Sequence, residues 1–134
     1  MNQARWLFGI AAGFNFVVAA GLTVGRPLLA PIVRMDTAAG TNAMLIDLAG
    51  VLIAAFGYGY ARAAANPDGF RQCISLGVVG KLLVVAVALA HFLAGDVAWP
   101  LPALASGDLL FAALFLQFLR RHRGSHRLHA FTSR

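Results

Sequence analysis

Three charged residues, Asp47, Lys81 and Asp108, interrupt stretches of the chain that are otherwise apolar. A charged side chain at mid-membrane costs on the order of 3 kcal/mol on insertion scales, so an acid or base in such a place is a candidate functional site. Two carboxylates and one ammonium can form one ion pair and leave one acid over. That acid could bind a cation, exchange a proton or hold a polar head group. The chemistry therefore depends on whether the three side chains meet.

The elements that must position these residues are four apolar runs of 19 or 20 residues, at 6–24, 43–61, 73–92 and 101–119. A helix needs about 20 apolar residues to cross the hydrocarbon core, whereas a membrane barrel needs about 8 or more strands of alternating residues. The chain is also 60% hydrophobic and only 12% charged. The sequence therefore predicts an all-α fold, a four-transmembrane-helix bundle with antiparallel up-and-down connections. It fills residues 1–120 as one domain and is followed by a basic tail at 121–134.

The arginines are distributed unevenly between the two ends of these predicted helices. Eight lie at the N-terminus, in the second loop and in the tail, whereas the first loop holds two and the third loop none. Because cytoplasmic segments are enriched in Lys and Arg, both termini are predicted to lie in the cytoplasm. The protein is then a multi-pass protein of the inner membrane. A cleaved signal peptide is disfavoured, because the first run exceeds the usual apolar length of about 7 to 15 residues.

The depth of each polar side chain follows from the helical rise, counted from the outer ends of the runs. Asp47 lies about 6 Å inward and Asp108 about 10 Å, while Asn15 lies about 14 Å and Lys81 about 16 Å inward. A lysine stem tends to snorkel toward water, so all four groups are predicted to converge in the outer half of the bundle. Each lies beside small side chains at helical spacing, which supports an inward face.

Two interpretations of this convergence stay open. In the first, Lys81 and Asp108 form a buried ion pair that fixes the register of the helices, and Asp47 is capped near the outer interface. In the second, the residues line a polar pocket that opens outward with a net charge near minus one, and Asp47 is the acid left to bind or titrate. His91 lies near the same stripe, where it could gate the pocket, sense pH or simply snorkel to the interface.

The loops allow further expectations. The first loop, 25–41, contains Pro27 and Pro31, which disfavour a long helix, so it forms either a short lid in the outer interface or a plain connection. The short second and third loops predict that the second helix neighbours the third, and that the third pairs with the fourth. The basic tail is predicted to lie against anionic lipid, and no motif for nucleic acid is present.

No cofactor or metal site is predicted. Cys73 is the only cysteine, which excludes a C-x-x-C pair and a multi-cysteine metal site. His122, His126 and His129 could share a helical face in the tail, but no carboxylate or cysteine joins them, so solvated residues are favoured. No nucleophile with a base and no phosphate loop is found, so we do not expect an enzyme.

Several short motifs follow one another across the second to fourth predicted helices: Gly57-Tyr58-Gly59-Tyr60, Asn66-Pro67-Asp68, Gly80-Lys81, and Gly107-Asp108 with Phe111 and Phe115. Together they resemble the small bacterial four-span membrane proteins grouped as DoxX-like. The resemblance implies a membrane helical bundle that is an accessory to a redox or respiratory system, and it transfers no catalytic residue. Cysteines seen in some of those proteins are absent here apart from Cys73, so no thiol role is implied.

The function predicted from these observations is that of a non-enzymatic membrane protein. Its outward-facing polar pocket would bind a small or lipidic ligand or a membrane partner. The alternative is a small oligomeric transporter or channel in which Asp47 or Asp108 exchanges a proton or cation. Such a path needs polar residues that continue to the inner side, and below Lys81 the sequence offers mainly Ser75 and Gln117. A pocket is therefore favoured over a pathway.

Overall fold

Each apolar run folds into one long helix in the computed structural model, which describes residues 2–36 and 38–123. The helices are α1 (Asn2–Leu22), α2 (Arg26–Val33), α3 (Gly40–Ala65), α4 (Arg71–Ala94) and α5 (Pro100–Arg123). The described residues form no strand, so the all-α class holds for this part of the chain. All helices except α2 are long and apolar enough to cross a membrane. The length and composition of these four helices are those of a multi-pass membrane protein.

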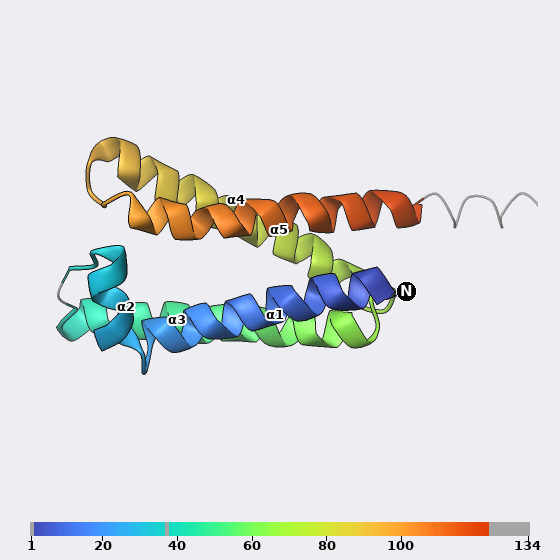
Figure 1. The fold of residues 1–134 in the computed structure, drawn as a ribbon, viewed down its shortest axis with the longest axis horizontal. Coiled ribbons are helices and arrows are strands. Elements are labelled where there is room, and N and C mark those ends of the chain that lie inside the picture. Colours follow the sequence, from blue (N-terminus) through green and yellow to red (C-terminus); the bar gives the residue numbers. More distant parts are fainter. Residues whose placement is uncertain (1, 37, 124–134) are drawn as a thin grey trace, which may run out of the picture.

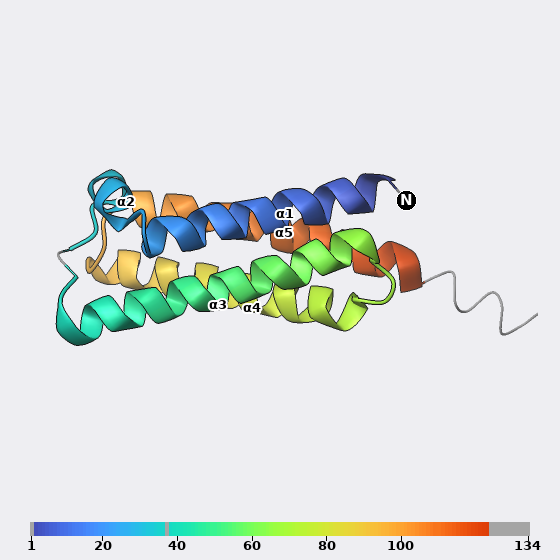
Figure 2. The ribbon, with the colours of Figure 1, turned by 90° about the horizontal axis from the view of Figure 1, so that it is seen from below.

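The four long helices pack as two pairs, one above the other in Figure 1. α1 lies along α3, and α4 lies along α5, while contacts between the two pairs are fewer. Figure 2, turned by a quarter, looks along the stacking direction, so that α1 overlaps α5 and α3 overlaps α4. The predicted pairing of the last two spans is confirmed. The second span, α3, also contacts α4, as predicted, but it packs mainly on α1.

Glycines on α3 and α4 allow these close approaches. A side-chain Cβ added at Gly57 of α3 would lie 3.2 Å from the Cβ of Asn15 on α1. A Cβ at Gly77 of α4 would lie 2.5 Å from the hydroxyl of Tyr60 on α3. Small residues let membrane helices approach closely, and Gly50 and Gly57 of α3 both lie against residues of α1. These glycines explain why α3 packs mainly on α1, although α4 follows α3 directly in the chain.

The two ends of the bundle differ in what they carry. One end holds the N-terminus, the 66–70 loop and the end of α5, and the other holds α2 and the 95–99 loop (Figure 1). We call these the inner and outer ends, following the orientation predicted from the arginines.

The hydrophobic core lies in the inner half. Phe8 of α1 packs 5.0 Å from Phe115 and 5.2 Å from Phe118 of α5, measured between ring centroids. Tyr60 of α3 lies 5.0 Å from Phe115 by the same measure. Ile74 of α4 is fully buried among them. Aromatic contacts at these separations add to the packing energy of the rings, so all four long helices are joined here.

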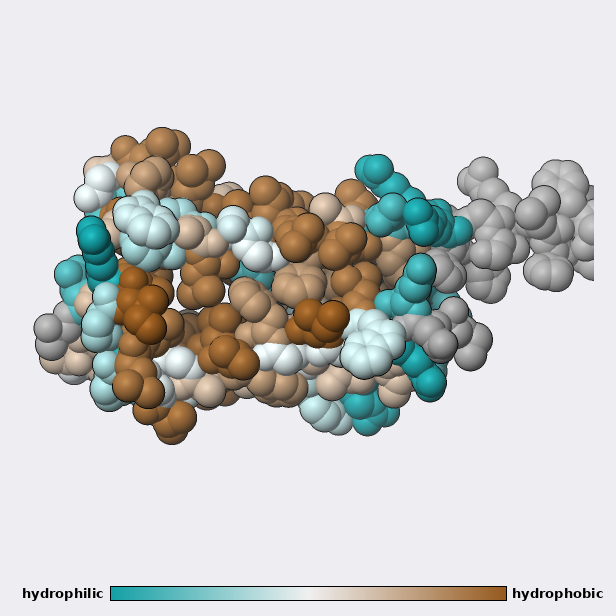
Figure 3. All heavy atoms as spheres, viewed as in Figure 1, coloured by the Kyte–Doolittle hydropathy of each residue, from teal (hydrophilic) through white to brown (hydrophobic). Residues whose placement is uncertain are grey.

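The outer half is packed more loosely between the two pairs. The buried residues of α4 are Ile74, Gly77, Val78 and Lys81, and none of the residues from Leu82 to Ala94 is buried. Figure 3 shows an opening between the two helix pairs toward the α2 end. Large apolar side chains such as Leu83 and Val87 are exposed in this region, as expected for a surface that faces lipid.

The first loop folds into α2, so it is a helix and not a plain connection. Pro27 lies in the first turn, where its missing N–H costs nothing, and Arg34 ends the helix in a left-handed conformation with φ of 54°. The amide of Met35 then donates to the carbonyl of Ala30 over 2.9 Å. α2 contacts both α1 and α5, and Val33 is buried. It therefore covers part of the outer end and bridges the two helix pairs.

Candidate functional site

Lys81 lies at the centre of a chain of polar contacts that joins all four long helices. Its ammonium forms an ion pair with Asp108 of α5 and donates a hydrogen bond over 3.2 Å to the side-chain oxygen of Asn15 on α1. The amide nitrogen of Asn15 in turn donates over 3.2 Å to the carbonyl of Ile53 on α3. Lys81 and Asn15 are each only 5% exposed. Asn15, Lys81 and Asp108 are called the polar cluster below.

Three aromatic rings complete the surroundings of the ammonium. The Lys81 nitrogen lies 5.3 Å from the ring centroids of Tyr60 and Phe111 and 5.8 Å from that of Phe14. These separations are within the range of a cation–π interaction, which strengthens where water is excluded. The rings therefore replace part of the hydration that a buried ammonium loses. Sequence reasoning missed these roles, although Phe14 adjoins Asn15 and Phe111 lies one helical turn after Asp108.

The ion pair makes the polar cluster electrically neutral. A buried pair with good hydrogen bonds can fix helix register without adding net stability, whereas one unpaired buried charge is costly. Asp108 is the most accessible member, since its side chain is 17% exposed against 5% for Lys81. A carboxylate can accept several hydrogen bonds, so the exposed part of Asp108 can accept from a further donor while Lys81 stays paired.

Asp47 is not a member of the polar cluster. Its carboxylate forms an ion pair with Arg26 of α2, and its side chain is 54% exposed. The same Arg26 donates through Nε to the carbonyl of Leu22 over 2.9 Å, which holds the guanidinium at the end of α1. Asp47 therefore links α3 to α2 at the outer end. The sequence predicted a pocket around Lys81 with a net charge near minus one, owing to Asp47. In the structure the Asp47 carboxylate lies at the outer end, paired with Arg26.

His91 is also separate from the polar cluster. Its Nδ1 lies 2.8 Å from a carboxylate oxygen of Asp96, and both side chains are more than half exposed. Gly95, with φ of 84°, reverses the chain at the end of α4, and the amide of Asp96 donates to the carbonyl of His91 over 2.9 Å. Glycine adopts this left-handed backbone without strain, which brings Asp96 back to His91. The pair therefore joins the last turn of α4 to the loop between α4 and α5.

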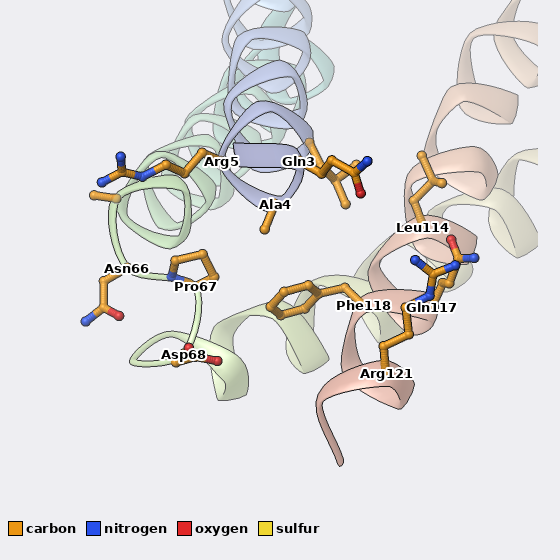
Figure 4. A pocket seen from close by; sticks show the side chains of 12 residues that line it. Gln3, Ala4, Arg5, Asn66, Pro67, Asp68, Leu114, Gln117, Phe118 and Arg121 are labelled. Atoms are coloured by element: carbon orange, nitrogen blue, oxygen red, sulfur yellow. The ribbon is translucent and has the colours of Figure 1, made fainter. Parts of the chain in front are cut away.

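Three cavities open toward the ends of the described part of the molecule. The first, of about 630 Å³, lies between the two helix pairs at the outer end and is called the outer cavity. Its walls come from the start of α3, the 95–98 loop and Leu101 of α5. The second, of about 940 Å³, lies beside α2 and includes Arg26 and Asp47. The third, of about 500 Å³, lies at the inner end and is called the inner cavity (Figure 4).

No member of the polar cluster lines any of these three cavities. Asp108 follows Leu101, in the wall of the outer cavity, by seven residues on the same helix, which corresponds to about 10 Å of helix. Figure 3 shows hydrophilic surface inside the seam between the helix pairs. The outer cavity therefore lies outward of the polar cluster, on the same helix α5 as Asp108.

Some of the predicted features involve residues that the structure does not describe. Residues 121–123 of the predicted basic tail continue α5, while residues 124–134, with His126 and His129, lie outside the described residues. Among those described, no three His, Cys, Asp or Glu side chains gather in a way that could hold a metal ion.

Comparison with known proteins gives no further identification. No protein-family model matches the chain, and neither curated proteins nor solved structures provide a similar one. The resemblance to DoxX-like proteins therefore stays a prediction from the sequence motifs.

Proposed function

We propose that the protein is a non-enzymatic integral protein of the bacterial inner membrane, with both termini in the cytoplasm and antiparallel spans. Its outer cavity admits a small or lipidic amphiphilic ligand toward the polar cluster. The observation that carries the proposal is the difference between the two halves of the bundle. The inner half is closed by packed aromatic rings, and the outer half is open between the helix pairs.

The closed inner half argues for binding over conduction. Phe8, Tyr60 and Phe115 are each exposed by 1% or less, and they lie between the polar cluster and the inner end. An ion or proton path needs polar groups or water throughout the membrane, since a charge in an apolar region is strongly disfavoured. The described inner core offers packed rings in that place. The transporter or channel alternative therefore receives no support from the packing.

The open outer half defines the class of ligand. The outer cavity combines apolar walls, such as Leu45 and Ile46, with charged groups at its mouth, such as Arg34 and Asp96. A ligand with an apolar body and a polar end that donates hydrogen bonds suits this combination, because the polar end can reach the accessible part of Asp108. Binding pockets are commonly apolar with a few placed polar groups, and this arrangement has both.

Two accessory expectations belong to the same proposal. The basic tail is proposed to lie on anionic lipid at the cytoplasmic face. The exposed outer half of α4 leaves room for a second copy or another membrane protein, and the resemblance to DoxX-like proteins would make that partner part of a redox or respiratory system.

Native mass spectrometry of the purified protein tests the binding proposal. We expect a co-purified small molecule or lipid on the wild-type protein, and its loss in Ala98→Phe, which places a ring in the outer cavity. The matched control is Ala90→Phe, an exposed position of α4 that does not line this cavity. A wild-type protein without any bound species, or equal retention in Ala98→Phe, would contradict the proposal.

Proton or cation flux into liposomes separates the binder from the transporter. We expect no flux above that of empty liposomes for the wild-type protein. A flux that Asp108→Asn abolishes, and Asp96→Asn does not, would replace binding by transport as the function.

A further inference from the structure

The inner cavity brings together the inner ends of both helix pairs. Its walls come from the first residues of α1, the loop after α3 and the last turns of α5. Figure 4 shows these segments around the space, with Phe118 pointing into it from α5 and Ala4 above it on α1. The three segments are far apart in sequence, so the cavity exists only because the helices pack as they do.

The polar lining of this cavity is predominantly basic. It includes Arg5 and Arg121 against the single acid Asp68, together with the amide side chains of Gln3 and Gln117. Gln117 and Arg121 are four residues apart on α5 and therefore share a face. In Figure 4, Gln3 reaches from α1 toward α5. In Figure 4, Arg121 lies beside Gln117, whereas Arg5 extends away from α5 toward Asn66. Within the described residues, Arg121 is not held by an ion pair, so its guanidinium can bind an anion.

The floor of the cavity is apolar. Leu7, Leu114 and Phe118 line it, and Phe118 also belongs to the buried core, where it packs against Phe8. The cavity lies where the spanning helices end, beside the last turns of α5. An anion held by Arg121 would therefore lie next to this apolar surface, at the depth of the membrane interface.

We propose that the inner cavity binds the phosphate head group of an anionic membrane phospholipid. Arginine recognises phosphate through paired N–H donors, and the amides of Gln3 and Gln117 add further donors. The start of an acyl chain would lie on Leu114 and Phe118, whereas a free phosphate would leave that floor unused. This site is distinct from the outer cavity, and it shares with the predicted basic tail only Arg121.

Lipid titration followed by native mass spectrometry tests this site on the delipidated full-length protein. The probes are phosphatidylglycerol, phosphatidylcholine with the same acyl chains, and inorganic phosphate. We expect phosphatidylglycerol to bind, phosphatidylcholine to bind more weakly and phosphate alone not to bind. Arg121→Gln should weaken phosphatidylglycerol binding about five-fold, as expected for one basic residue near an anionic lipid.

The matched control is Arg120→Gln, which removes the same charge from the neighbouring exposed residue that does not line the cavity. It should leave phosphatidylglycerol binding within about two-fold of wild type. Equal weakening by Arg120→Gln, equal binding of both lipids, or binding of inorganic phosphate that depends on Arg121 would each overturn the proposal.

Discussion

Lys81 and Asn15 are joined across the seam between the two helix pairs by a 3.2 Å hydrogen bond from the ammonium to the amide oxygen. Asn15 continues the connection to the carbonyl of Ile53, and Lys81 continues it to Asp108. One run of polar contacts therefore links α3, α1, α4 and α5 in the apolar interior. Of these contacts, the one between Lys81 and Asn15 crosses from one helix pair to the other, in addition to the aromatic core of the inner half.

Asp108→Asn is expected to destabilise the protein by about 3 kcal/mol, because it leaves the Lys81 ammonium buried without a countercharge. Unfolding in detergent micelles, followed by circular dichroism, measures the loss. Asp96→Asn is the matched control, since Asp96 is exposed and its pairing with His91 is worth at most about 1 kcal/mol.

The same pair permits a rescue experiment. Adding Lys81→Met to Asp108→Asn removes the stranded charge, so the double variant should regain most of the lost stability. If the double variant unfolds as easily as Asp108→Asn alone, Lys81 and Asp108 are not coupled in the way described.

Asn15→Leu keeps the branching of the side chain and removes both hydrogen bonds of the amide. We expect a loss of about 1–2 kcal/mol, the range measured for polar contacts between membrane helices. The same unfolding assay applies. Asn42→Leu, at an exposed position near the start of α3, provides the control and should change little. Similar effects of the two substitutions would show that the bonds of Asn15 do not hold the helices together.

Gly77→Ala is expected to destabilise the protein by about 1–3 kcal/mol, the usual cost of overpacking a filled core. Its Cβ would lie 2.5 Å from the hydroxyl of Tyr60, which is buried and cannot move aside. Gly13→Ala on α1 is the matched control, because nothing lies within 4 Å of its Cβ. That variant should be neutral or slightly more stable through helix propensity. A Gly77→Ala protein as stable as Gly13→Ala would contradict the tight contact of α3 and α4.

Asp47→Asn is expected to cost less than about 1 kcal/mol, since its partner Arg26 is at the outer surface and Asp47 is half exposed. The effect should shrink further with added salt, which screens exposed charges. Unfolding of Asp47→Asn and Asp108→Asn at low and high salt provides the comparison. A large, salt-independent loss for Asp47→Asn would place Asp47 in a buried site.

The depth of the polar residues could be predicted from the sequence to a useful degree. Counting along the helices placed Asn15, Lys81 and Asp108 in reach of one another, and the structure brings these three side chains together. The same count failed to separate Asp47 from them, because depth does not say which side of a helix faces which neighbour. It also did not anticipate that α2 would bring Arg26 beside Asp47.

By itself, the sequence determined the number of spanning helices, their approximate ends and the short helix-breaking loops between them. These features are local, since about 20 apolar residues suffice for a span and residues such as Pro27, Gly95 and Pro100 mark helix ends. Only the tertiary structure decided that α3 packs mainly on α1, that three rings surround Lys81 and that the inner half closes while the outer half stays open. Those outcomes depend on how small and large side chains fit between helices, which the order of residues along one helix does not specify.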